Sequence, residues 1–281
     1  MKAKARQSGM TLTEMTVVIL AAALLASLAA PAVRGLLGSF ESPGSTRAMI
    51  SAAMASARAI AAKEHRYAGI RFQKAYDAKL PTVDCPQYMI FIIHDPNLAR
   101  KDPCDYELPS RLFRAVEGLK PIRLPDSVGV MDLELGSISV PGPLADDVFE
   151  PGLKDRILTD TTTFSVVFAP SGKLVIRGVQ TRNRDGYPPS ELPFPRSYDD
   201  VFNKLQEVAR GTGMFVQDDD ENQGSGLWQE LSRSSFIIYE TAKFKKAYER
   251  GRAYSEYLAL LGSKICINPY TGALISESGS Q

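Results

Sequence analysis

The run Gly9-Met10-Thr11-Leu12-Thr13-Glu14, continued by MTVVILAAALLASLAAPAV from Met15 to Val33, sets the architecture that we expect for this chain. Residues 15–33 carry no charge and are mostly apolar. About 20 residues at a rise of about 1.5 Å per residue match a hydrocarbon layer of ~30 Å, which predicts one membrane-spanning helix. Lys2, Lys4 and Arg6 precede it and predict a cytoplasmic N-terminus, with the remaining chain in the periplasm.

Glu14 is unusual because it stands at the cytoplasmic edge of this apolar run. A carboxylate at the centre of a membrane helix would cost roughly 2.5 to 3.5 kcal/mol on insertion scales, so Glu14 needs a partner. A cut between Gly9 and Met10 would create an α-amino group on Met10 at a similar depth. Glu14 could then pair with the Met10 amine of a neighbouring helix.

These residues resemble the cleavage and methylation motif of prepilins, in which a glycine precedes the cut and a glutamate stands near the start of the mature apolar helix. The resemblance implies that a prepilin peptidase cleaves after Gly9 and methylates the amine of Met10. Prepilins usually have phenylalanine at the position of Met10. Pro31 falls where many pilins carry a proline that kinks the helix, because an internal proline removes a backbone hydrogen bond.

A secretory signal peptide is the main alternative interpretation of the N-terminus, since small residues occupy 27–30 after the apolar centre. It would release a soluble protein that begins near Ala30. Two residues argue against it: Glu14 interrupts the junction between the basic and apolar parts, and Pro31 would hinder cleavage after Ala30. An uncleaved membrane anchor is a further alternative.

The chain after the N-terminal segment predicts an α+β fold. Ile50, Ala53, Met54, Ala57, Ile60 and Ala61 repeat at helical spacing, so we expect a helix from Ser45 to about Lys63 that packs on a sheet. A second amphipathic helix is expected at about 242–261. The predicted strands are 88–94, 122–125, 128–135 and 236–239, a hairpin over 164–179 that turns at 170–172, and two short strands around a turn at 268–272.

By resemblance, the whole fold is expected to be pilin-like: a long N-terminal apolar helix, then an antiparallel β-sheet domain with an additional helix. The expected divisions are a basic leader at 1–9, a transmembrane and assembly helix at 10–40, and a periplasmic domain at 45–281. Leu124-Pro125 before a strand, together with Phe168-Ala169-Pro170-Ser171-Gly172, resembles the minor pseudopilins of type II secretion systems, notably the H-type subunit. Residues 181–230 are interpreted as an insertion with one short amphipathic helix, which favours a minor subunit.

Composition argues against other classes of function. The 281 residues include 33 basic and 32 acidic side chains, a net charge of +1, so no global field favours nucleic acid. The only histidines are His65 and His94, each at the end of a predicted element and without a recognisable catalytic neighbour. No nucleotide-binding loop, nucleophile elbow or zinc-protease motif occurs. We therefore expect no enzyme, no catalytic residue and no cofactor.

Two weaker candidate sites remain. The acidic run 218–222 suggests calcium, because hard cations prefer clustered oxygen ligands, and Asp219, Glu221 and Glu230 are its candidate ligands. A solvated acidic loop is the simpler interpretation. Cys85 and Cys104 flank a predicted strand and can form a disulfide in an oxidising compartment, whereas buried free thiols are the alternative.

The resemblance implies a structural subunit of a type II secretion pseudopilus or a type IV pilus-like filament, held in the inner membrane by one span. Its partners would be other pilins or pseudopilins, the prepilin peptidase and the inner membrane. Glu14 would set the register between subunits, because open head-to-tail contacts produce a filament. A membrane-tethered binding module that does not polymerise is the alternative. The motif is shared by secretion, pilus and DNA-uptake systems, which therefore remain open.

Overall fold

The computed structural model describes Met15 and residues 43–98, 111–132, 151–184, 199–218, 227, 229–258 and 263–276. The chain divides between Ser42 and Pro43 into two units, and the second of them forms the fold described below. The predicted leader at 1–9 and, except for Met15, the predicted transmembrane helix at 10–40 lie outside the described residues. Within the described ranges, no helix is both long enough and apolar enough to span a membrane.

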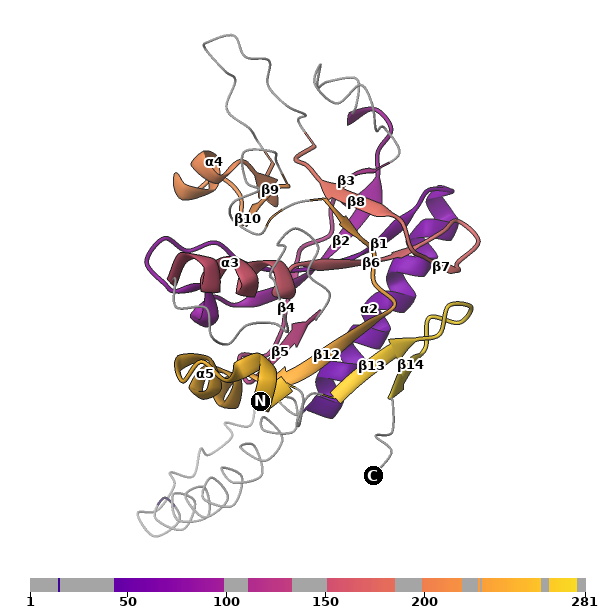
Figure 1. The fold of residues 1–281 in the computed structure, drawn as a ribbon. Coiled ribbons are helices and arrows are strands. Elements are labelled where there is room, and N and C mark those ends of the chain that lie inside the picture. The colour runs from indigo at the N-terminus through magenta and orange to yellow at the C-terminus, as the bar shows by residue number, and fades with distance from the viewer. Residues whose placement is uncertain are drawn as a thin grey trace, which may run out of the picture. The chain divides into compact units, whose positions relative to one another are not determined.

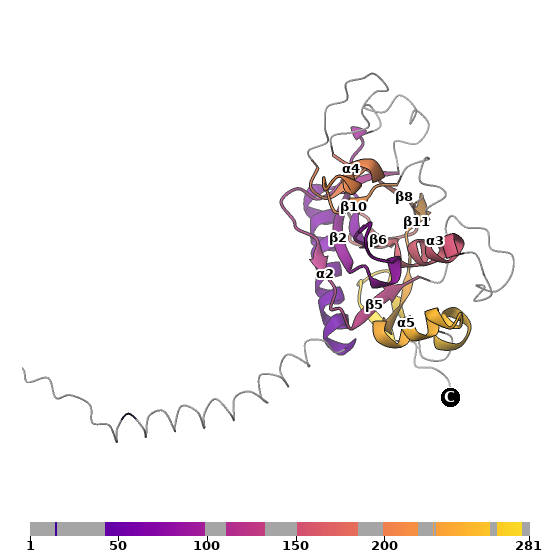
Figure 2. The same cartoon turned by 90° about the vertical axis from the view of Figure 1, so that its left-hand side faces the viewer.

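The first described helix, α2 (Pro43–Glu64), packs along its length against β-structure (Figures 1 and 2). Its expected apolar face is confirmed, because Ile50, Met54, Ala57 and Ala61 are completely buried. The helix begins two residues before the expected Ser45, at a proline, whose fixed φ suits a first helical turn. Alanines on the buried face let the helix backbone approach the strands closely.

The main sheet has a mixed strand order and a strong curl. Its path is β11 (Glu230–Leu231), β8 (Gly178–Thr181), β3 (Leu112–Ala115), β2 (Gln87–His94), β1 (Ala68–Lys74), β6 (Phe164–Phe168) and β7 (Leu174–Val175), with β4 (Ile122–Arg123) paired to β2. Most pairs are antiparallel, but β3 and β8 are parallel. The curl brings the segment after β11 beside β6, near the other end of the path. There the Arg233 amide donates to the Ser165 carbonyl of β6 at 2.7 Å.

The second sheet is antiparallel and lies beside the lower part of α2 in Figure 1. Its order is β14 (Leu274–Ser276), β13 (Ser263–Ile267), β12 (Ser235–Glu240) and β5 (Val128–Met131). The remaining elements are η1 (Thr82–Asp84), α3 (Pro151–Thr162), α4 (Leu205–Ala209), α5 (Thr241–Glu249), the π-helical turn η4 (Ala253–Leu258), and a parallel two-stranded sheet of β9 (Phe202–Asn203) and β10 (Phe215–Val216).

Three larger clusters of buried side chains hold these layers together. The first lies between α2 and both sheets and includes Phe72, Phe164 and Phe236. The second lies between the other face of the second sheet and α3, α5 and η4, around Phe244. The third fills the concave face of the main sheet, where Phe202 of β9 and Phe215 of β10 cover strands β2, β3 and β6.

The predicted fold class, a pilin-like α+β fold with a long apolar helix before an antiparallel sheet, is wrong for the described structure. A mixed, curled main sheet replaces the antiparallel one, and the described helices include no long apolar helix. The physical reason lies in residues 174–179, which were expected to form the second strand of one hairpin. Leu174–Val175 completes that hairpin, but the chain then leaves β6, and β8 pairs in parallel with β3 instead.

Several local predictions are confirmed and others fail. The strands predicted at 88–94, 122–125, 128–135 and 236–239 appear as β2, β4, β5 and β12, and the turn at 268–272 joins β13 to β14. Gly172 and Gly272 have φ of +78° and +69°, the conformation that favours glycine in these turns. The helix predicted at 242–261 is interrupted, since α5 ends at Glu249 and η4 follows. Strand β1 and helix α3 were not predicted.

Gln87 joins the two sheets through its side-chain amide. Its Nε2 donates to the carbonyls of Val130 (2.7 Å) and Thr162 (2.9 Å), and its Oε1 accepts from the Val130 amide (2.8 Å). The Gln87 side chain therefore bonds both backbone groups of Val130, as a neighbouring strand would. We expect Gln87→Leu to lower the free energy of unfolding by about 1 to 3 kcal/mol, because it leaves buried backbone groups without partners.

Urea denaturation of the full-length protein would measure the effect of Gln87→Leu, with Glu117→Leu as an exposed control. Glu117 lies in a turn at the surface, so its replacement should change stability little. Equal effects of the two substitutions would show that the Gln87 contacts do not stabilise the joint between the sheets.

Candidate functional site

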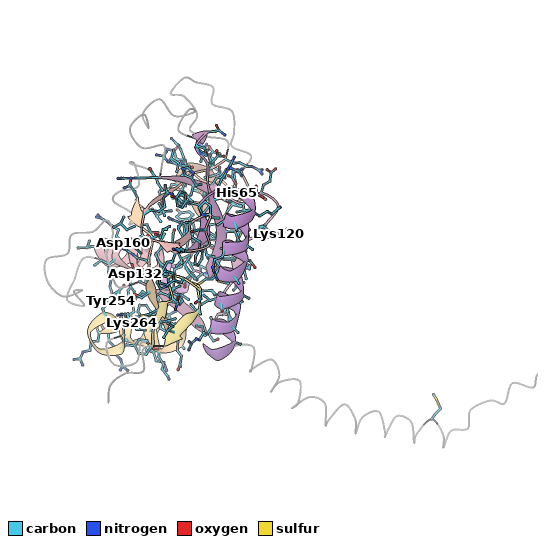
Figure 3. All side chains as sticks on the ribbon, turned by 90° about the vertical axis from the view of Figure 1, so that its right-hand side faces the viewer. His65, Lys120, Asp132, Asp160, Tyr254 and Lys264 are labelled. Atoms are coloured by element: carbon cyan, nitrogen blue, oxygen red, sulfur yellow. The ribbon has the colours of Figure 1, made fainter. Side chains whose placement is uncertain are left out.

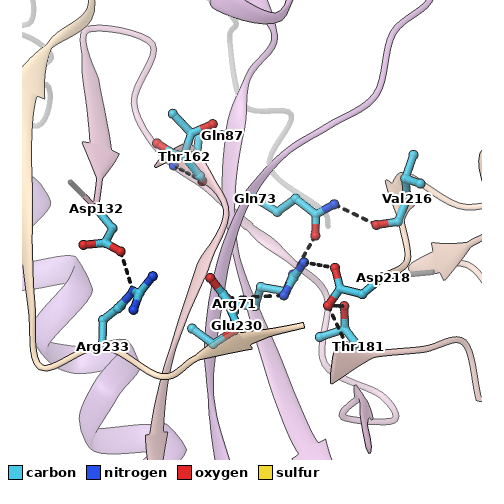
Figure 4. A network of polar contacts seen from close by, with 11 residues as sticks. Arg71, Gln73, Gln87, Asp132, Thr162, Thr181, Val216, Asp218, Glu230 and Arg233 are labelled. Atoms are coloured by element: carbon cyan, nitrogen blue, oxygen red, sulfur yellow. Dashed lines mark hydrogen bonds and ion pairs between the residues drawn. The ribbon is translucent and has the colours of Figure 1, made fainter. Parts of the chain in front are cut away.

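The concave face of the main sheet carries a buried group of polar side chains centred on Arg71 (Figure 4). Strand β1 alternates: Ala68, Ile70 and Phe72 face α2, while Arg71 and Gln73 face the concave side. Arg71 has no solvent exposure. A buried guanidinium must find partners, because leaving a charge unpaired in the interior costs several kcal/mol.

Asp218 is the closest ionic partner of Arg71. Its Oδ1 lies 2.5 Å from Nη2 of Arg71, and its Oδ2 accepts from the amide (2.8 Å) and the hydroxyl (3.0 Å) of Thr181 on β8. Burial raises the pKa of Asp218, while the Arg71 charge and the Thr181 donors oppose that rise. Asp218 thus ties the segment after β10 to both β1 and β8.

Gln73 and Glu230 complete the set around Arg71. Nε of Arg71 donates to Oε1 of Gln73 (2.8 Å), and Nε2 of Gln73 donates to the carbonyl of Val216 (2.8 Å). Oε1 of Glu230, on β11, lies 3.5 Å from Nη1 of Arg71 and accepts from the Ser165 hydroxyl at 3.1 Å. We call Arg71, Gln73, Asp218 and Glu230, with Thr181 and Ser165, the Arg71 network.

A second buried ion pair lies beside the network. Arg233, after β11, pairs with Asp132, after β5 (Figure 4). Figure 3 places Asp132 and Tyr254 on the side of the molecule away from α2. The two ion pairs connect the end of β11 to the main sheet on one side and to the second sheet on the other. Both ion pairs hold together segments that are distant in sequence.

Neither protein-family models, nor curated proteins, nor solved structures match the chain. Within the part of the chain that the structure describes, no group of three or more histidine, cysteine, aspartate or glutamate side chains is arranged to hold a metal ion.

The sequence-predicted site residues are only partly described. Gly9, Met10, Glu14 and Pro31 lie outside the described residues, so processing and assembly stay predictions. Of the calcium candidates, Asp219 and Glu221 also lie outside them. Glu230 is described, and its carboxyl is buried against Arg71 and Ser165.

Only one of the two cysteines of the predicted disulfide lies among the described residues. Cys85 is a buried free thiol, with Sγ 3.6 Å from the carbonyl of Pro81, and Cys104 lies outside the described residues. Burial raises the pKa of the Cys85 thiol, while the neighbouring Lys74 charge opposes the rise. Burial also lowers the pKa of Lys74 to about 8, and its ammonium donates to the carbonyls of Val83 and Cys85. The disulfide stays a prediction.

His65 lies in a turn, and His94 packs against aromatic rings. His65 directly follows α2, has φ of +50° and lies at the upper end of that helix in Figure 3. The ring of His94 makes edge contacts with Tyr67 and Phe113, at centroid distances of 6.2 and 5.7 Å.

Sequence reasoning missed Arg71 and Gln73 because strand β1 was not predicted. A signal was present: residues 68–73 read Ala-Gly-Ile-Arg-Phe-Gln, which alternates apolar and other residues with the period of a strand. Polar residues in that pattern are normally assigned to a solvated face. Here the residues around 199–218 and 229–233 cover that face, and no local pattern in 68–73 indicates such a cover.

Proposed function

We propose that this chain is a prepilin-like subunit that prepilin peptidase cuts after Gly9 and that assembles into a secretion pseudopilus or pilus-like filament. The observation that carries the proposal is Gly9-Met10 with Glu14 at the edge of the uncharged stretch from Met15 to Val33. A membrane-embedded carboxylate needs a cationic partner, and cleavage creates one on Met10. The pairing of Glu14 with the Met10 amine of an adjacent subunit would align subunits along the filament.

The described domain supports a tethered role. A body with its own buried core begins at Pro43, shortly after the apolar stretch ends at Val33. The preceding segment can therefore hold such a body outside the inner membrane. Leu124 and Phe168, from the two motifs that resemble minor pseudopilins, both lie in the cluster around α2. This resemblance favours a minor subunit over a major one.

The mature N-terminus tests the processing. The protein would be isolated from its host with and without active prepilin peptidase, and its first residues identified by mass spectrometry. We expect N-methylated Met10 as the first residue in the presence of the peptidase and retention of residues 1–9 in its absence. A mature chain that begins near Ala30 would instead identify a secretory signal peptide.

Glu14→Ala tests assembly separately from processing. We expect the variant to be cleaved after Gly9 but to be lost from purified filaments by about tenfold or more, because one ion pair of about 1.4 kcal/mol or more per contact is removed. Thr13→Ala is the matched control, since it alters the adjacent residue without removing a charge. A tethered binding module would retain its function with Glu14→Ala.

A further inference from the structure

Of the two carboxyls in the Arg71 network, Glu230 is held less closely by Arg71. Asp218 lies 2.5 Å from the Arg71 guanidinium and receives two further hydrogen bonds from Thr181. Glu230 lies 3.5 Å from the same guanidinium without a hydrogen bond from it, and Nη1 of Arg71 makes no hydrogen bond at all. The Ser165 hydroxyl, a neutral group, donates a hydrogen bond to Glu230.

One guanidinium therefore serves two buried carboxyls. Two carboxylates that share one site cannot both ionise without raising the pKa of one of them, and burial favours the neutral form. The geometry assigns the charge to Asp218, which has the shorter ion pair and the backbone donor. The neutral form then falls to Glu230.

We propose that Glu230 carries a proton at neutral pH and acts as a pH-sensitive latch, whose neutral carboxyl keeps β11 in place and whose ionisation in alkaline solution loosens the closure of the main sheet. The position of Glu230 suits this role. Its strand pairs with β8, and the Ser232 amide extends that pairing by donating to the carbonyl of Arg177, just before β8. The Arg233 amide donates across to the Ser165 carbonyl of β6. Release of β11 would therefore open the curl.

Charged groups face Glu230 from several elements. Arg71 lies on β1, Asp218 follows β10, Asp132 follows β5, and Arg233 follows β11 itself. Burial raises the pKa of Glu230 well above its usual value; the charges of Asp218 and Asp132 add to the rise, and those of Arg71 and Arg233 oppose it. Burial and the two aspartates outweigh the two arginines, so the pKa of Glu230 is raised.

The sign of the pH effect follows from proton binding. A carboxyl whose folded pKa exceeds its unfolded value of about 4.5 binds more protons in the folded state between those two values. Its contribution to stability is therefore fully present in acid and is lost as the pH rises through the folded pKa. Burial gives Asp218 the same sign, so a variant of Glu230 is needed to separate the two.

Glu230→Gln in the full-length protein provides the test, because an amide copies the shape of a neutral carboxyl and cannot ionise. Amide hydrogen exchange of Ser232 and Arg233 would be followed from about pH 6 to about pH 9 after correction for intrinsic rates. In the wild type, we expect opening to rise by up to about tenfold per pH unit between the unfolded and the folded pKa, since one proton is released per opening in that range, and to level off above the folded pKa. Glu230→Gln should remove that rise, whereas Asp126→Asn, at an exposed carboxylate, should retain it.

An equal pH dependence in Glu230→Gln and the wild type would overturn the proposal. Carbon NMR of the Glu230 carboxyl in the wild-type protein is a second measurement that does not depend on the variant folding. A protonated carboxyl at about pH 7 is the expected result, and an ionised one contradicts the proposal. Neither result depends on prepilin processing, so the latch and the proposed function can fail separately.

Discussion

Arg71→Ala is expected to lower the free energy of unfolding by about 3 to 5 kcal/mol, among the largest effects of any single substitution in this chain. The substitution removes the cation that faces Asp218 and Glu230, so at least one buried carboxylate loses its compensation. It also removes the donor to Gln73, which holds the carbonyl of Val216. Urea denaturation of the full-length protein in mild detergent would measure the loss.

Arg123→Ala is the matched control for Arg71→Ala. Arg123 pairs with Asp126 at 2.6 Å, almost as closely as Arg71 pairs with Asp218, but both side chains are exposed. Surface ion pairs contribute at most about 1 kcal/mol, so the control isolates the effect of burial. Similar losses from the two substitutions would contradict the role of the Arg71 network as an internal fastening.

A triple variant separates charge compensation from packing. Arg71→Met with Asp218→Asn and Glu230→Gln removes all three ionisable groups while it retains most of the side-chain volume. Buried ion pairs can often be replaced by neutral groups at little cost, so the triple variant should recover a large part of the stability lost in Arg71→Ala. Failure to recover any of it would place the contribution of Arg71 in its packing.

Phe72→Ala is expected to cost about 3 to 5 kcal/mol by a different mechanism. Phe72 occupies the opposite face of β1, is fully buried, and stacks on Phe164 at a centroid distance of 4.8 Å and near Phe236 at 5.8 Å. These rings come from β6 and β12, so a cavity there would weaken contact between α2 and both sheets. The denaturant midpoint should fall with little change in its slope.

Tyr270→Ala is the control for the loss of an aromatic ring, because Tyr270 is 70% exposed in the turn between β13 and β14. Its ring lies 5.5 Å from the Lys173 ammonium, a surface contact worth about 0.5 to 1 kcal/mol. A loss in Phe72→Ala no larger than that in Tyr270→Ala would show that the cluster around α2 tolerates a cavity.

Local patterns accounted for elements that are stabilised by their own periodicity or turn chemistry. The apolar face of α2 repeats at helical spacing, and Gly172 and Gly272 occupy turns that favour positive φ. Strand β2 contains the continuous apolar run Met89–Ile93, and its bounds were predicted to within one residue. In each case the information lies within about 20 residues of sequence, where hydrophobic burial and backbone conformation act locally.

Residues far apart in sequence decided the remainder. The parallel pairing of β3 with β8 joins segments more than 60 positions apart, and the contact between Arg71 and Asp218 spans 147. Neither has a local signature, because the energy of a buried ion pair depends on which segments exclude water from it. The segment at 181–230 was interpreted as an insertion, yet its described parts cover the concave face and supply Asp218 and Glu230.

By itself, the sequence determined the amphipathic face of α2 and the turns at 170–172 and 268–272; prepilin processing after Gly9 stays a prediction. The tertiary structure alone decided that β1 is a central strand, that its polar face is buried, and that the main sheet curls until β11 closes it. The physical reason is that periodicity records which residues alternate, whereas burial of the second face depends on a cover supplied by distant segments.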